Sequence, residues 1–276
     1  MNYEFATRMT DLTPSAVREI MKNAVEQDDI LFASGNPATE SFPLAAIREI
    51  TEDILNNDAF EVLKYGISEG YQPLRDRLAL RMKEKYACRN DSDEVLITSG
   101  AQQVIDMACR VLLNEGDTVI CDSPCYMGAL NVFRSYNVHI KGVEMEKDGL
   151  NLDKLEQLLK TEKNVKLLYV VPNFQNPTGI TMSMEKRKAV YALCKKYGVL
   201  ILEDDPYGEL RYSGGAIAPI KSMDTDGIVI YSGSFSKVLS AGIRVGFSYA
   251  PKPISDKIIL AKQVSYVHTN TFFQVM

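Results

Sequence analysis

Lys237 and Arg244 lie close together in a stretch rich in serine and glycine, which follows an apolar run at 227–230. The run predicts a buried strand, and the stretch predicts a turn at its end. Hydroxyls, backbone amides and a guanidinium in one turn could converge on a phosphate. The lysine could neutralise charge or, with a depressed pKa, act as a nucleophile. Taken alone, the stretch leaves open a solvated surface lysine.

A second turn of this kind follows an apolar run at 94–97. Gly100, Ala101 and Gln102 lie there, where a helix is expected to begin. Free backbone N–H groups and the helix dipole suit a phosphate at such a position. An ordinary capped turn between strand and helix is the alternative.

Amides and an aromatic side chain follow two other apolar runs. Asn176 lies in the turn-forming segment 172–179, where an amide could orient a polar group of a ring, although a surface turn fits as well. Tyr126 follows the run at 118–121 and either contributes an aromatic face to the same edge or packs into the core.

Three consecutive acids, at 203–205, follow the apolar run at 199–202. A carboxylate at the end of a buried strand has to be paired or solvated, so we expect a cationic partner. Asp204 and Tyr207 are about one turn apart and could face one site. A magnesium site built from the three acids is the competing hypothesis.

Short apolar runs alternate with amphipathic stretches along most of the chain, after an irregular N-terminal arm at 1–12. This alternation predicts an α/β fold with a mainly parallel, doubly covered sheet, which binds ligands beyond the carboxyl ends of its strands. We expect helices at 13–25, 43–56, 73–86, 101–113, 124–135, 152–160, 185–197 and 253–276. We expect strands at 94–98, 118–121, from 138, 166–171, 199–202, 228–230 and 245–249.

Composition limits the function classes. Hydrophobic content of 46% and charged content of 24% are ordinary for a globular protein, and a net charge of −5 argues against nucleic-acid binding. Neither a transmembrane run nor a secretion signal is found, so we expect a cytoplasmic protein without a membrane partner. The five cysteines form no C-x-x-C pair and the two histidines lie apart, which predicts reduced thiols and no metal site.

The motifs together resemble a known family. In chain order they are Ser34-Gly-Asn-Pro, Tyr65-Gly, Ser99-Gly-Ala-Gln, Asn176-Pro-Thr-Gly, Asp204-Asp-Pro-Tyr and Ser234-Phe-Ser-Lys with Arg244. The chain resembles the fold-type I pyridoxal-phosphate enzymes, specifically the class I/II aminotransferases, and looks closest to the 2-aminoadipate and aromatic aminotransferase group.

The resemblance implies a role for each matching residue. Lys237 would hold the cofactor as an aldimine and shuttle a proton, and Asp204 would keep the pyridine nitrogen protonated. Tyr207 and Asn176 would bond the ring hydroxyl, and Tyr126 would stack on the ring. The phosphate would be bound by Gly100, Ala101, Gln102, Ser234, Ser236, Arg244 and, from the neighbouring subunit of a homodimer, Tyr65. Gly35 and Asn176 would line the substrate site.

The resemblance also implies a reaction and a domain plan. An amino group would pass between an L-amino acid and a 2-oxo acid. Residues 1–45 would form an arm and first helix, and 46–276 the large cofactor-binding domain, with the family's C-terminal small domain lacking. A β-eliminating C–S lyase of the same fold, or the ligand-sensing domain of a transcription regulator, remains an alternative. A P-loop is excluded because 233–238 lacks the G-x-x-x-x-G-K-[ST] pattern.

Overall fold

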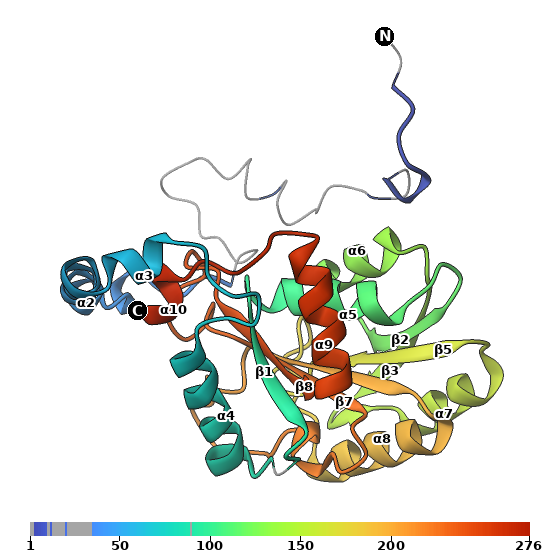
Figure 1. Ribbon diagram of the computed structural model, residues 1–276. Coiled ribbons are helices and arrows are strands. Elements are labelled where there is room, and N and C mark those ends of the chain that lie inside the picture. The colour runs from blue at the N-terminus through green and yellow to red at the C-terminus, as the bar shows by residue number, and fades with distance from the viewer. Residues whose placement is uncertain (1–2, 10–11, 13–19, 21–34, 89) are drawn as a thin grey trace.

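The computed structural model describes residues 3–9, 12, 20, 35–88 and 90–276, and the expected helix at 13–25 lies largely outside them. An eight-stranded sheet in the order β1-β8-β7-β6-β5-β2-β3-β4 forms the centre (Figure 1). Its strands are β1 Asp93–Thr98, β2 Thr118–Ser123, β3 His139–Glu146, β4 Gly149–Leu150, β5 Val165–Val170, β6 Leu200–Asp205, β7 Val229–Ser234 and β8 Gly246–Pro251. The block from β7 to β3 is parallel, whereas β8 runs antiparallel to both of its neighbours.

Helices cover both faces of this sheet (Figure 1). They are α2 Leu44–Asn57, α3 Ala59–Leu63, α4 Gln72–Tyr86, α5 Ala101–Leu112, α6 Met127–Ser135, α7 Leu152–Thr161, α8 Met184–Tyr197, α9 Lys252–Gln263 and α10 Phe272–Val275. Short 3-10 helices lie at η1 Thr7–Met9, η2 Thr39–Ser41 and η3 Ile220–Met223.

The strand pleat assigns each face its own core. In β5, Leu167 and Tyr169 pack with residues of α5 and α6, whereas Leu168 and Val170 pack with residues of α7 and α8. Successive residues of a strand point to opposite faces, so a strand buried on both sides reads as a continuous apolar run. The expected doubly covered, mainly parallel α/β sheet is confirmed.

Local sequence signals account for both ends of α8. The Ser183 Oγ accepts a hydrogen bond from the Lys186 N–H at 3.2 Å and caps the start of α8. The same helix ends at Gly198, whose φ of 68° is the left-handed conformation that glycine adopts freely. Helix α6 begins at Met127 rather than at the expected position 124, with Tyr126 as its N-cap.

The expected single helix at 253–276 is wrong. Helix α9 ends at Gln263, and the backbone N–H groups of Ser265, Tyr266 and Val267 all donate to the carbonyl of Lys262. Val267 has a φ of 67°, which no helix continues through, and a separate short helix follows at 272–275. Lys262 is fully buried and its ammonium donates to the Ile97 carbonyl, so a contact distant in sequence decides this end.

Two further findings bear on the composition. Cys88, Cys109, Cys121 and Cys194 are buried and Cys125 is partly buried, and all five are free thiols, as expected. Among the described residues, no helix combines the length and apolar character needed to cross a bilayer.

Lys221 anchors the edge of the sheet from η3. Its fully buried ammonium lies 2.8 Å from Asp93 Oδ1, 2.9 Å from Asp224 Oδ2 and 2.9 Å from the Val229 carbonyl. Burial raises the pKa of Asp93, whereas the Lys221 charge and two backbone N–H groups leave the pKa of Asp224 lowered despite its burial. One cation therefore holds β1, β7 and η3 together.

We expect Lys221→Ala to lower the free energy of unfolding by about 3–5 kcal/mol, because it leaves two buried carboxylates without their cation. Lys195→Ala is the control, since it removes an exposed ion pair with Asp226 and should cost about 1 kcal/mol or less. Urea denaturation followed by circular dichroism measures both. Equal losses in the two variants would contradict the assignment.

Candidate functional site

The predicted site residues gather around one end of the sheet. Most of them lie at or just beyond the carboxyl ends of β1, β2, β5, β6 and β7. We call this group the strand-end cluster: Gly100, Ala101, Gln102, Tyr126, Asn176, Asp204, Tyr207, Ser234, Ser236, Lys237 and Arg244. Parallel strands bring their carboxyl ends to one edge of a sheet, which is why segments far apart in sequence meet there.

Arg244 joins the two turns that could bind an anion. Its Nη2 donates to the Ser99 carbonyl at 3.0 Å, and its Nη1 lies 3.3 Å from Ser236 Oγ. Gly100 is the N-cap of α5 with a φ of 84°, and a side chain there would overlap the guanidinium. The backbone N–H groups of Ala101 and Gln102 open α5 and have no acceptor within the described chain. A guanidinium and free amides thus lie at the same turn, an arrangement that suits an anion.

Gly246 lets these turns approach each other. It lies in β8 between Thr98 of β1 and Ser234 of β7. A Cβ at Gly246 would lie 2.7 Å from the Gly100 carbonyl carbon and 2.8 Å from the Ala101 nitrogen. Both neighbours are backbone atoms and cannot yield as a flexible side chain can. The absence of a side chain at Gly246 is therefore a condition for the close approach of the α5 turn to β8.

Lys237 lies in the second turn and is only partly exposed. Its Nζ donates to the Gly35 carbonyl at 2.6 Å, which brings the predicted substrate residue next to the predicted cofactor lysine. Burial, and then the positive charge of Arg244, lower the pKa of Lys237. A lysine with a depressed pKa carries more of its unprotonated, nucleophilic form at neutral pH.

Asp204 is a buried carboxylate, only 3% exposed, on the face of β6 that α5 covers. Its oxygens accept hydrogen bonds from the Tyr169 hydroxyl at 2.8 Å and from Ser232 Oγ at 3.0 Å. Burial raises its pKa to about 6, against the lowering effect of these two hydroxyls. The expected cationic partner is not found among the described side chains, so a cation at this carboxylate would come from a ligand.

Tyr207 and Asn176, both predicted to bond the ring hydroxyl, lie next to each other, and the Asn176 Nδ2 donates to the Tyr207 hydroxyl at 3.2 Å. Burial first, and then the charge of Asp204, raise the pKa of Tyr207, which keeps the phenol protonated. The loop that carries Asn176 is tied to the Tyr126 loop, because Gln175 Nε2 donates to the Pro124 carbonyl at 2.7 Å. The Tyr126 hydroxyl in turn donates to Gln102 Oε1 at 3.2 Å.

The magnesium hypothesis for the three acids is wrong. Strand β6 extends to Asp205, and its pleat places Glu203 and Asp205 on the face opposite to Asp204. Glu203 accepts hydrogen bonds from the backbone N–H groups of Ile220 and Lys221 instead. Three carboxylates on two faces of a sheet cannot share one ion, and no triad of potential metal ligands occurs within the described residues.

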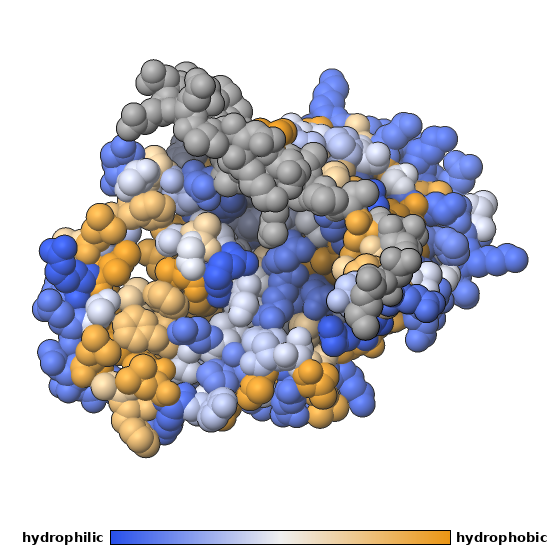
Figure 2. Space-filling view, turned by 90° about the horizontal axis from the view of Figure 1, so that it is seen from above, coloured by the Kyte–Doolittle hydropathy of each residue, from blue (hydrophilic) through white to orange (hydrophobic). Residues whose placement is uncertain are grey.

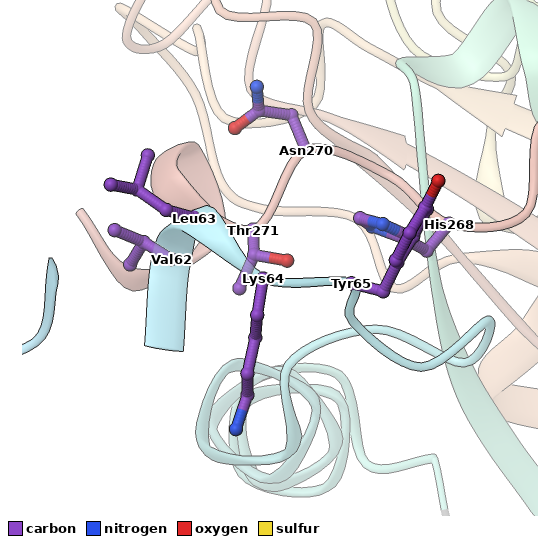
Figure 3. Close-up of a pocket in the computed structure, with 7 residues that line it drawn as sticks. All are labelled: Val62, Leu63, Lys64, Tyr65, His268, Asn270 and Thr271. Atoms are coloured by element: carbon purple, nitrogen blue, oxygen red, sulfur yellow. The ribbon is translucent and has the colours of Figure 1, made fainter. Parts of the chain in front are cut away.

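Tyr65 lies apart from the strand-end cluster in its contacts. It is 84% exposed and stacks edge-on against His268, with ring centroids 5.9 Å apart. The two rings line a surface pocket together with Val62, Leu63, Lys64, Asn270 and Thr271 (Figure 3). Within the described chain, no hydrogen bond joins Tyr65 to the cluster. Its predicted contact with the cofactor phosphate of a neighbouring subunit stays a prediction.

Several supporting residues did not emerge from the sequence. Tyr169 and Ser232 bond Asp204, and Asn173 and Arg187 form a buried network next to the cluster. A polar residue inside an otherwise apolar strand, such as Ser232, was the available signal. Arg187 gave the opposite signal, since it lies in a charged amphipathic stretch that predicts an exposed side chain.

Comparison with known proteins decides the family. The model of the aminotransferase class I and II family matches residues 27–275. The chain belongs to the class I and II aminotransferases.

Similar proteins support the assignment. The aromatic-amino-acid aminotransferase 1 of Thermococcus litoralis is 40% identical over 282 residues, covering 100% of this chain and 68% of that protein. The 2-aminoadipate transaminase of Thermus thermophilus is 37% identical over 265 residues, covering 95% and 65%. The crystal structure of a kynurenine aminotransferase from Pyrococcus horikoshii, in complex with PMP, superposes with a TM-score of 0.93 at 38% identity, covering 98% and 68%.

The aminotransferase therefore uses pyridoxal phosphate to move an amino group between an amino acid and a 2-oxo acid. The described residues fit this cofactor. The free amides of α5 and the Arg244 guanidinium match a phosphate, and the buried Asp204 carboxylate matches a protonated ring nitrogen. Lys237, with its lowered pKa, matches a group that binds an aldehyde.

The raised pKa of Asp204 leads to a prediction about the stability of the cofactor-free protein. This pKa is raised in the folded state, so folding binds a proton and stability falls as pH rises from the unfolded value near 4 through about 6. We expect the free energy of unfolding of Asp204→Asn to exceed that of wild type by up to about 3 kcal/mol at about pH 8. The gain should shrink steadily as the pH falls toward about 4.

Urea denaturation of the cofactor-free proteins across this pH range measures the difference. Asp76→Asn, on the exposed face of α4, controls for the loss of one negative charge. A gain independent of pH, or no gain at about pH 8, would show that burial does not destabilise the ionised Asp204.

Proposed function

We propose that the strand-end cluster is the pyridoxal-phosphate site of this aminotransferase, and that Lys237 is its catalytic lysine. The observation that carries the proposal is Lys237 itself, a partly buried lysine of lowered pKa in the same turn system as Arg244 and the start of α5. The proposal gives one lysine both duties that the reaction needs, which are to hold the cofactor and to carry a proton.

The other residues divide the remaining work. When bound, the cofactor serves as the electron sink for the substrate's α-carbon. Asp204 stabilises a positive charge at the ring nitrogen, and Tyr207 with Asn176 donates hydrogen bonds to the ring hydroxyl. Tyr126 packs against the ring, and Lys237 Nζ moves the proton at the α-carbon. The phosphate is bound by Arg244, Ser234, Ser236 and the α5 turn at Gly100, Ala101 and Gln102.

We infer that the amino donors are of the aromatic or 2-aminoadipate type. The named relatives act on such amino acids, and the identities of 40% and 37% extend over nearly the whole chain. Gly35, at hydrogen-bond distance from Lys237, would line the substrate entrance with Asn176. The proposal includes a cytoplasmic location, no nucleic-acid or membrane partner, an N-terminal arm and first helix at 1–45 and a cofactor-binding domain at 46–276.

We further propose that the enzyme is a homodimer in which Tyr65 contacts the partner's cofactor phosphate. Apolar side chains gather on the side of the molecule where α2 and α3 lie (Figure 2). Leu44, Phe60 and Leu63 of this region are 65%, 77% and 75% exposed. Exposed apolar patches of this kind mark interfaces in folded proteins, and the exposed Tyr65 follows directly after them.

Replacing the lysine tests the proposed site. We expect purified enzyme with pyridoxal phosphate to show a visible or near-ultraviolet absorption band, and borohydride reduction to change this band and attach the cofactor irreversibly to the protein. Lys237→Ala should lose this band and all transamination, because the strand-end cluster contains no second lysine that could bind the aldehyde. Lys195→Ala, an exposed lysine of α8, should keep both.

The same preparation distinguishes the reactions. Aromatic amino acids and 2-aminoadipate, offered with a 2-oxo acid, should yield the corresponding new 2-oxo acid. Pyruvate and thiol release from cystathionine would instead favour the C–S lyase. A band that persists in Lys237→Ala would contradict the proposed role of this lysine.

Subunit mixing tests the dimer. Tyr65→Phe should weaken cofactor binding about 10–100-fold, the cost of one hydrogen bond to a charged phosphate. Co-expression of Tyr65→Phe with inactive Lys237→Ala should create hybrid dimers in which one site has both Tyr65 and Lys237. Such hybrids, isolated through two different tags, should show wild-type cofactor affinity at that site. If Tyr65 acts within its own subunit, mixing restores nothing.

A further inference from the structure

Asp205 lies on the opposite face of β6 from the proposed cofactor carboxylate Asp204 and is buried at 7% exposure. Its Oδ1 accepts hydrogen bonds from Asn173 Nδ2 at 2.9 Å and from the Gly208 N–H at 3.0 Å. Its Oδ2 accepts one from the Tyr231 hydroxyl at 3.0 Å. All of these partners are neutral, and two of them belong to loops that lead into the strand-end cluster.

The bond to Gly208 closes a tight turn around Tyr207. Asp205 and Gly208 flank Pro206 and Tyr207, so a carboxylate-to-amide bond across the turn holds the backbone that carries the phenol. A Cβ at Gly208 would come within 2.6 Å of Asp205 Oδ1, and the carboxylate cannot move aside without losing its bonds to Asn173 and Tyr231. The turn is therefore built around this one side chain.

The bond to Asn173 extends the same control to the other loop. Asn173 precedes Asn176, the residue that donates to the Tyr207 hydroxyl. Its Oδ1 accepts from Arg187 Nη2 at 2.7 Å, and the same nitrogen donates to the Pro172 carbonyl at 3.0 Å. Arg187 is fully buried and also donates to the carbonyls of Met182 and Ala218, both at 3.0 Å. A guanidinium anchored in this way holds the start of the loop rigidly.

We propose that Asp205, supported by Asn173 and Arg187, is a positioning residue that fixes Tyr207 and Asn176 against the cofactor. The proposal rests on the proposed function, because it assigns Asp205 the task of orienting two residues of the proposed cofactor site. Asp205 touches neither of them and acts through the Tyr207 turn and the Asn173 loop. Glu203 lies two residues earlier on the same face, but it bonds Ile220 and Lys221 and reaches neither loop.

The test is a double-mutant cycle read by spectroscopy. The pH midpoint of the cofactor's absorbance change and its dissociation constant are measured for wild type, Asp205→Ala, Tyr207→Phe and the double variant. We expect Tyr207→Phe to raise the midpoint by about one pH unit, the size expected for one hydrogen bond. Asp205→Ala should shift it in the same direction and weaken cofactor binding about tenfold. The double variant should shift little beyond Tyr207→Phe alone.

Two matched variants separate positioning from general stability. Glu203→Gln changes a buried carboxylate of the same strand face and should leave the midpoint unchanged, whatever it costs in thermal stability. Asp205→Asn keeps an oxygen for Asn173 and Gly208 and should restore the midpoint. If Asp205→Ala does not fold, Asn173→Ala, which removes the same link from the other side, takes its place in the cycle.

The outcomes also separate the two proposals. Additive shifts in the cycle, or a wild-type midpoint in Asp205→Ala alongside a shifted Tyr207→Phe, would overturn the positioning role and leave the proposed cofactor site intact. A wild-type midpoint in Tyr207→Phe itself would instead contradict the proposed site.

Discussion

The structure depends on carboxylates that lie inside a sheet whose two faces are both covered by helices. Removing a carboxylate from water costs free energy unless hydrogen bonds and a counter-charge compensate it. Asp204 has two hydroxyl donors but no cation in the described chain, so its burial raises its pKa to about 6. The fold therefore tolerates a group that is more favourable with a cationic ligand than without one. This links the site to the rest of the sheet, because Tyr169 and Ser232 have to be held by their own strands.

The pleat of β6 gives its two aspartates different environments. Asp204 faces the α5 side, where the Gly100 turn and Tyr126 lie, whereas Asp205 faces Tyr231 and the α8 side. Both carboxylates have pKa values raised first by burial, yet only Asp205 bonds residues of the two loops, Asn173 and Gly208. Adjacent residues of one type can therefore divide ligand binding and loop anchoring between them, because a strand presents them to opposite sides.

The sequence was sufficient for those features that depend on local pattern. Apolar runs of strand length, amphipathic stretches of helix length and turn residues at strand ends predicted the sheet and the residues of the strand-end cluster. The sequence was insufficient where a distant contact decides. The end of α9 depends on the buried Lys262 reaching Ile97 in β1. The extension of β6 to Asp205 depends on its pairing with β7, and hydroxyls from β5 and β7 with an amide of the 173 loop bond its two buried aspartates. Periodicity does not report such partners.

Glycine positions also show a limit of prediction from sequence, because the role of a missing side chain depends on what lies next to it. Gly246 looks like any strand glycine in the sequence, yet only its missing Cβ lets the Gly100 turn lie against β8 beneath Arg244. An anion site made of backbone amides has no characteristic side chains by which the sequence could reveal it, and its geometry is set by how closely strands approach. The α5 turn packs backbone against backbone on β8, and a turn held in place in this way would lose less entropy when a phosphate binds. With a phosphate at such a site, the phosphate contacts, rather than burial of Lys237, would determine where the cofactor ring lies.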